Sequence, residues 1–136
     1  MSLAEVRWID LPNKVDERGE LTFMQGGQHI PFPIERVFYV YHVSDNAVRA
    51  CHSHRATKQF VIPIAGTFML DLTDGYSTNS YEMSSPKRGI YVPPMIWDRL
   101  YHFSHDAVCL VLASTKFDES DYIRDWQTYL NVVGKV

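Results

Sequence analysis

Short segments rich in β-branched and aromatic residues follow one another along the chain, separated by Gly, Pro, Asn and Asp. Such segments predict β-strands, and the clearest runs from Val37 to Val43. KQFVIPIAG and TFMLDLTDG predict a hairpin that turns at Ala65-Gly66, and Asp74-Gly75 predicts the next turn. VRWIDLPNKVDERGELTFMQ predicts two short strands around a turn, and further strands are expected in VRACHSHR, YEMSS, RGIYVPPMIW, DRLYHFS and AVCLVLAS.

The spacing of these strands predicts an all-β fold. Strands about 8–12 residues apart are typical of a sandwich or barrel and not of βαβ units. The final segment alone has a helical period, with apolar residues at Tyr122, Ile123, Trp126, Tyr129 and Leu130. Asp118 or Ser120 would cap this helix. No linker divides the sequence, so we expect residues 1–136 to form a single domain.

Composition and charge exclude several functional classes. The chain has 136 residues, 46% of them hydrophobic and 21% charged, and its net charge of −3 does not favour a nucleic-acid surface. No apolar run is long enough to span a membrane, and the N-terminus lacks the pattern of a signal peptide. Cys51 and Cys109 lie in apolar stretches, which favours buried free thiols in a cytoplasmic protein.

The candidate chemistry is concentrated in RACHSHRATKQF, which runs from Arg49 to Phe60. Residues i and i+2 of a strand point to the same face, so His52 and His54 are expected to face one space. Arginines flank the pair, and nearby cations lower the pKa of a histidine, which favours the neutral form that a general base requires. Cys51 would point the other way, into the core.

The same stretch has the spacing of the first motif of a jelly-roll cupin, but two metal ligands are altered. Gln59 stands where the first motif has glutamate, and Asp98, in PPMIWD, stands where the second cupin motif has its histidine. Glutamine carries no charge and is a weak ligand. A set of His52, His54 and Asp98 would still suit iron(II), so a metal-dependent, dioxygenase-like cupin remains an alternative.

Four stretches of the chain resemble the sugar-nucleotide 3,4-ketoisomerases, the WxcM-like, FdtA-type cupins. They are IERVFYVYHV, RACHSHRATKQFVIPIAGTFMLDLTDG, GIYVPPMIWDRLYHFS and CLVLASTKFDESDYIRDW, and the family signature RGFHAHK aligns without gaps with RACHSHR. The resemblance implies a jelly-roll cupin without a metal or other cofactor, and a homodimer with exchanged N-terminal strands. It also implies a dTDP-linked 4-keto-6-deoxyhexose as substrate and a product used for the deoxyaminosugars of surface lipopolysaccharide.

The alignment with the family indicates candidate site residues position by position. His52, His54 and Arg49 match the polar residues of the signature, and Gln59 matches the glutamine after it. Matches outside the signature lie at Arg18, Tyr39, Tyr91 and Trp97. Three departures are Ala50 for glycine, Cys51 for phenylalanine and Asp98 for the histidine that follows tryptophan. A carboxylate at position 98 could orient a histidine or alter which sugar epimer forms.

Ketone migration requires a base that removes the C3 proton and a donor that supports the developing oxyanion. We assign His54 as the carbon base, with His52 and Tyr39 as proton relay or oxyanion donor. Guanidinium groups bind pyrophosphate well, which makes Arg18 and Arg49 substrate-binding candidates. Gln59, Tyr91, Trp97 and Asp98 complete the predicted substrate site. A non-catalytic sugar-nucleotide binding protein is the alternative from outside the enzymes.

Overall fold

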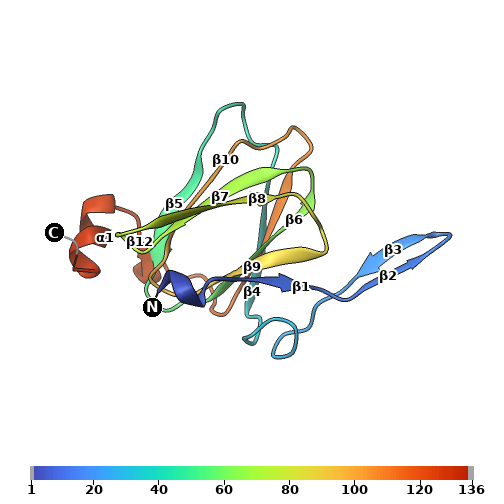
Figure 1. The fold of residues 1–136 in the computed structure, drawn as a ribbon. Coiled ribbons are helices and arrows are strands. Elements are labelled where there is room, and N and C mark those ends of the chain that lie inside the picture. The colour runs from blue at the N-terminus through green and yellow to red at the C-terminus, as the bar shows by residue number, and fades with distance from the viewer. Residues whose placement is uncertain (1, 135–136) are drawn as a thin grey trace.

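Two five-stranded antiparallel sheets face each other in the computed structural model, which describes residues 2–134 (Figure 1). The first sheet has the order β1-β9-β6-β11-β4, with the bounds Arg7–Asp10, Arg88–Val92, Gln59–Ala65, Val108–Ala113 and Arg36–Tyr41. The second has the order β12-β5-β10-β7-β8, with the bounds Tyr122–Ile123, Arg49–His54, Trp97–Tyr101, Phe68–Thr73 and Thr78–Met83. The predicted all-β jelly roll with a short C-terminal helix is confirmed.

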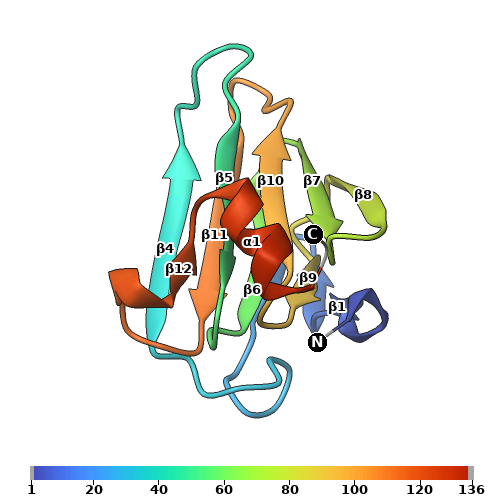
Figure 2. The same ribbon diagram turned by 90° about the vertical axis from the view of Figure 1, so that its left-hand side faces the viewer.

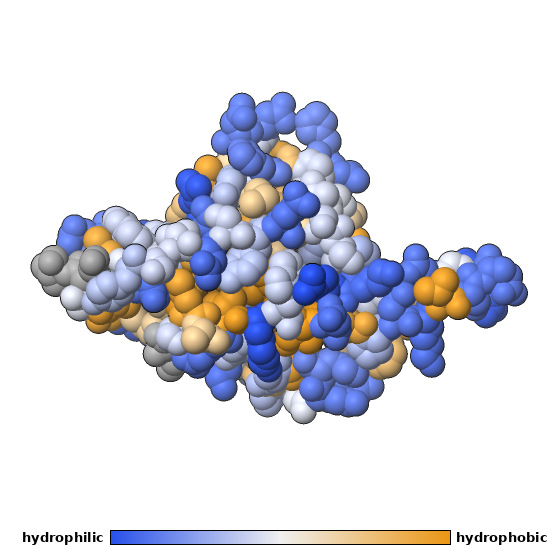
Figure 3. Space-filling view, in the orientation of Figure 1, coloured by the Kyte–Doolittle hydropathy of each residue, from blue (hydrophilic) through white to orange (hydrophobic). Residues whose placement is uncertain are grey.

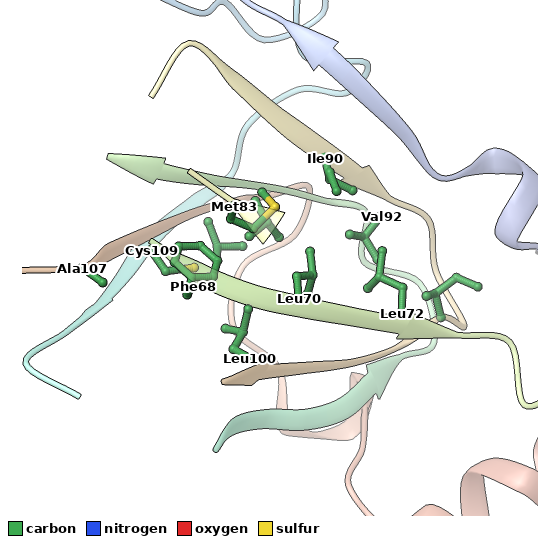
Figure 4. Close-up of a cluster of buried hydrophobic side chains, with 12 residues drawn as sticks. Phe68, Leu70, Leu72, Met83, Ile90, Val92, Leu100, Ala107 and Cys109 are labelled. Carbon is green, nitrogen blue, oxygen red and sulfur yellow. The ribbon is translucent and has the colours of Figure 1, made fainter. Parts of the chain in front are cut away.

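The main hydrophobic core lies between the two sheets (Figure 4). In β7 the buried residues alternate with half-buried ones, which places Phe68, Leu70 and Leu72 on the inner face. They pack against residues of the first sheet such as Ile90 and Val111. At about 25 cal/mol per Å² of buried apolar surface, this shared core is the principal force that holds the sheets together.

The turn at Ala65-Gly66 differs from the sequence-based prediction. β6 pairs with β9 and β11 in the first sheet, whereas β7 pairs with β8 and β10 in the second, so the predicted hairpin of β6 with β7 is wrong. Gly66 has φ +65°, and a Cβ there would lie 2.6 Å from the Cα of Ala107. A glycine turn can join the two strands of a hairpin or form a corner between two sheets. Only the long-range pairing of the strands distinguishes these two cases.

The N-terminal region forms three strands where two were predicted. After β1, the strands β2 (Asn13–Asp16) and β3 (Gly19–Thr22) pair only with each other. Figure 1 shows this hairpin projecting from the sandwich as an arm. The loop that follows covers the outer face of the first sheet, where Ile30 and Phe32 are buried against Phe60 and Ile62.

The C-terminal helix is shorter than predicted. Asp118 caps a 3-10 turn, Glu119–Asp121, and Tyr122–Ile123 then form strand β12 against β5. Helix α1 covers only Trp126–Val132, with Asp125 as its N-cap, and it packs on the outer face of the second sheet (Figure 2). Because two residues suffice for β12, no strand period could reveal it. None of the helices in residues 2–134 has the length and apolar character required to cross a membrane.

Candidate active site

A pocket lies between the sheets, lined by residues of β4, β5, β6, β10 and β11. Its polar residues come from three strands: Arg49 and His52 from β5, Gln59 from β6 and Asp98 from β10. The remaining wall is largely apolar and includes Phe38, Val61, Leu100 and Val111. An apolar pocket with a few convergent polar groups is the usual form of a small-molecule site.

A β-bulge in β5 shapes one wall of this pocket. Asp98 lies opposite His52 and Arg99 lies opposite Ala50, so Cys51 is the extra residue on β5. Ala50 and Cys51 have φ +69° and +63°. Arg49 and Ala50 would face opposite sides of a regular strand, yet both line the pocket. The bulge thus brings Arg49 to the site, while Cys51 points away from it but packs half-buried against Trp97 and Tyr129 on the outer face, not in the core as predicted.

His52 presents one ring nitrogen to the site and holds the other against a carboxylate. Nδ1 lies 3.3 Å from Oδ1 of Asp98, and the His52 side chain is 13% exposed. Burial, followed by the charge of His54, lowers the pKa of His52 to about 4, so the ring is neutral at pH 7. Nε2 of His52 has no hydrogen-bond partner in the described chain, which leaves it available to a substrate.

Both ring nitrogens of His54 are already engaged. Nδ1 lies 2.9 Å from Oδ2 of Asp121, and Nε2 lies 3.2 Å from Nε2 of Gln59. The carboxylate can only accept and the Gln59 amide nitrogen can only donate, so His54 is neutral with its proton on Nδ1. Burial lowers the pKa of His54, and the hydrogen bond that His54 donates to Asp121 partly opposes that shift. His54 is 3% exposed and does not line the pocket.

Asp121 holds three groups together. It accepts hydrogen bonds from the Thr57 hydroxyl, the Ala56 backbone N–H and the His54 ring. Burial acts to raise the pKa of Asp121, but these bonds outweigh it and the pKa is lowered. The carboxylate therefore stays ionised at neutral pH and orients His54.

Tyr122 closes the site on the side of β12. Its ring centroid lies 4.3 Å from that of His54 and 5.0 Å from that of His52, and the guanidinium of Arg124 lies 4.1 Å from it. The Tyr122 hydroxyl accepts a 3.4 Å hydrogen bond from Arg36. The sequence-based reasoning gave no role to Asp121 or Tyr122, because it expected a helix there.

The structure brings five of the nine predicted site residues together and leaves four outside or at the edge. Arg49, His52, Gln59 and Asp98 line the pocket, and His54 lies directly behind Gln59. Tyr39 borders the pocket, but it pairs across strands with Leu110 on the outer face and its side chain is 60% exposed.

Arg18, Tyr91 and Trp97 lie away from the pocket within the described chain. The Arg18 side chain is 84% exposed on the β2–β3 arm and contacts Asp16. Tyr91 packs against the outer cluster of the first sheet, because it alternates with the inward-facing Ile90 and Val92. Trp97 is buried beneath α1, 5.1 Å from the Trp126 ring. None of the three lines this pocket in the described chain, and their assignment to the substrate site stays a prediction.

The donor atoms do not form a metal-binding set. Within residues 2–134, no group of three or more His, Cys, Asp or Glu side chains is arranged to hold a metal ion. Both nitrogens of His54 are committed to Asp121 and Gln59, so this histidine cannot ligate without breaking a buried network. The residues therefore do not fit the alternative iron site of His52, His54 and Asp98.

The fold and the site define a cupin with an acid–base pocket built on neutral histidines. The chain matches the family model described as "WxcM-like, C-terminal" (FdtA) over residues 4–134, and it belongs to this family. A relative from Aneurinibacillus thermoaerophilus, named TDP-4-oxo-6-deoxy-alpha-D-glucose-3,4-oxoisomerase, is 33% identical over 132 residues. That match covers 97% of this chain and 95% of the relative.

Solved structures of a sugar 3,4-ketoisomerase from Thermoanaerobacterium thermosaccharolyticum, QdtA, share the fold. Its complex with TDP has a TM-score of 0.95 and 34% identity, and the match covers 98% of this chain and 97% of that one. A histidine-to-asparagine mutant of the same enzyme, in complex with TDP-4-keto-6-deoxyglucose, has a TM-score of 0.95 and 33% identity. The match covers 98% of this chain and 96% of the mutant. The resemblance inferred from sequence is confirmed.

Proposed function

We propose that this chain is a nucleotide-sugar 3,4-ketoisomerase that moves the ketone of dTDP-4-keto-6-deoxyglucose from C4 to C3. One observation carries the proposal: a neutral histidine, His52, lines the pocket with Nε2 free and Nδ1 held. Family membership and the activities named for the similar enzymes support the choice of substrate. We infer that the product serves aminodeoxysugar synthesis for surface polysaccharide.

We propose that the two histidines have the reverse of the roles assigned to them from sequence, and their hydrogen bonds support this. His54 cannot accept a proton at Nε2 without losing the hydrogen bond from Gln59, whereas Nε2 of His52 is unpartnered. We therefore assign His52 as the carbon base. His54 orients the Gln59 amide at the pocket wall, where its oxygen or second N–H can bind a sugar hydroxyl.

The reaction balances without a redox partner. Nε2 of His52 removes the C3 proton, the C–H electron pair forms the C3=C4 bond, and the C4 oxygen takes the negative charge. The proton of the C3 hydroxyl passes to the C4 oxygen, which shifts the charge to the C3 oxygen. The imidazolium then returns its proton to C4, and the ketone forms at C3.

Arg49 supplies the positive charge for the nucleotide end of the substrate. It lines the pocket and belongs to the exposed end of β5, so its guanidinium is available to the pyrophosphate. The apolar wall excludes water from the reacting carbons, which keeps the enediolate from unproductive proton exchange.

We also propose a homodimer in which the β2–β3 arm is exchanged. The arm exposes Val15 and Leu21, and Figure 3 shows an apolar spot on this otherwise hydrophilic projection. The edge strand β4 exposes Val37, Tyr39 and Tyr41 on one face. Exposed apolar groups of this kind favour an interface, and exchange would carry Arg18 to a second subunit.

An isotope experiment tests the proposed activity. The protein is incubated with dTDP-4-keto-6-deoxyglucose in deuterated water, and C3 and C4 are followed by NMR. We expect a 3-keto product that carries deuterium at C4 only in those turnovers in which the His52 imidazolium exchanges its proton with solvent before it returns it. His52→Asn should form this product about 10²–10⁴-fold more slowly. Tight sugar-nucleotide binding without formation of the 3-keto product would indicate a binding protein and contradict the proposal.

A further inference from the structure

Asp98 and His52 form a buried pair across two strands. They are direct partners in the β5–β10 register, and cross-strand partners share a face of the sheet. The Asp98 side chain is only 7% exposed, and its Oδ1 lies 3.3 Å from Nδ1 of His52. The nearby backbone N–H of His52 also favours the ionised form of this carboxyl.

Few charged groups compete for this carboxylate. Within the described residues, His52 is the only side chain that forms an ion pair or a side-chain hydrogen bond with Asp98. Tyr39 and Arg49 are the other ionisable residues that line the pocket. Cys51 from β5 and Cys109 from β11 also lie close enough to interact with the Asp98 charge.

We propose, on the basis of the function given above, that Asp98 is a positioning residue that fixes the tautomer of His52. The carboxylate accepts the proton of Nδ1, which leaves Nε2 with the lone pair that removes the C3 proton. The opposite tautomer would place the proton on Nε2 and make His52 a donor, incapable of the first step. The side chain acts through His52 and not on the sugar.

The pair also explains how the positive charge that develops on His52 during the reaction is stabilised. When Nε2 takes the C3 proton, the imidazole becomes a cation inside an apolar pocket, where an unpaired charge is costly. Asp98 lies beside that cation and compensates its charge until the proton returns to C4. A carboxylate at position 98 therefore replaces the usual family histidine with a group that serves the base itself.

The first test reads the tautomer in the wild-type protein without substrate, so it does not depend on turnover. With 15N-labelled histidine, long-range 1H–15N spectra at pH 8.5 should show His52 protonated at Nδ1. The His52 signals are identified by their loss in His52→Asn. Protonation of His52 at Nε2 would overturn the assignment. A confirmed Nδ1 tautomer with no isomerase activity would instead reject the proposed function and leave the dyad intact.

The second test compares Asp98→Asn with Asp71→Asn. An amide at position 98 can donate to Nδ1 and so favour the wrong tautomer, and we expect kcat to fall by about 10²–10⁴-fold with KM nearly unchanged. Asp71 is a matched control, because it is a largely buried strand aspartate bonded to Ser80, Tyr101 and Arg99 outside the pocket. Wild-type kcat in Asp98→Asn would also overturn the proposal.

Discussion

His54 and Asp121 lie 67 residues apart in the chain and are joined by a 2.9 Å hydrogen bond between Nδ1 and Oδ2. The bond connects β5, which forms part of the pocket wall, to the segment that leads into β12. It also fixes His54 with its proton on Nδ1, so that Nε2 accepts from Gln59. Together with Gln59, this carboxylate engages both ring nitrogens of His54.

The first prediction concerns stability. Asp121→Asn should lower the free energy of unfolding by about 1–3 kcal/mol, because one of the two carboxylate oxygens that accept the three hydrogen bonds is replaced by an amide donor. Urea unfolding measures the change. Asp125→Asn is the matched control and should change stability by less than about 0.5 kcal/mol, since asparagine caps a helix as well as aspartate does. Equal effects of the two changes would contradict the structural role of Asp121.

The second prediction separates the two histidines. His52→Asn should reduce kcat by about 10²–10⁴-fold, because it removes the carbon base. His54→Asn should retain measurable turnover at about one tenth to one hundredth of wild type, since it disturbs only the position of Gln59. Steady-state kinetics with substrate, and binding of TDP by calorimetry as a control for folding, provide the comparison. Loss of turnover in His54→Asn alone would restore His54 as the base.

The third prediction concerns the bulge. Ala50 has φ +69°, a left-handed conformation that costs a residue with a Cβ about 1–2 kcal/mol. Ala50→Gly removes this strain but makes the unfolded chain more flexible, so we expect a net gain in stability of up to about 1 kcal/mol. Thermal unfolding can measure it. Ala47→Gly, at a position without positive φ, should instead destabilise the protein.

The fourth prediction concerns pH. Burial raises the pKa of Asp98 to about 7, so lowering the pH through this value protonates the carboxyl. A protonated Asp98 donates to Nδ1 of His52 and moves the ring proton to Nε2, which blocks proton removal from C3. We expect kcat/KM to fall by about tenfold per pH unit well below pH 7 and to level off above it. A profile that is flat from pH 5 to about 9 would contradict this coupling.

The fifth prediction concerns the proposed exchange of the arm. Arg18→Ala and His52→Asn should each be weakly active alone, because one lacks the arm's cation and the other lacks the base. Mixed dimers would contain one pocket with His52 and a partner arm with Arg18, so mixing after denaturation should restore about a quarter of the wild-type sites. Sedimentation should give a dimer. A monomer, or no recovery on mixing, would reject the exchange.

Much of the fold could be predicted from the sequence, because strand periodicity is local. The alternation in TFMLDLT identifies the inner face of β7, and the His52–Ser53–His54 spacing puts both imidazoles on one side of β5, with ring centroids 5.2 Å apart. Strand partners are not local. The turn at Gly66 therefore suggested a hairpin, although the chain crosses there to the other sheet.

The sequence predicted the residue types of the candidate site better than it predicted the role of each residue. RACHSHR and Gln59 identified a pocket with two histidines and an arginine, because these residues follow one another on β5 and β6. Tyr91 and Trp97 were predicted for the site but do not line this pocket in the described chain, since an aromatic residue in a strand suits either face until the opposing layer is known.

The sequence by itself determined a jelly roll with paired histidines on one strand face and a cysteine on the other. Only the tertiary structure decided which histidine can act as a base. That decision depends on two carboxylates, Asp98 and Asp121, which are 46 and 67 residues away from the histidines they contact. A hydrogen bond fixes a tautomer only when donor and acceptor meet at about 3 Å, and sequence spacing cannot specify such a distance across strands.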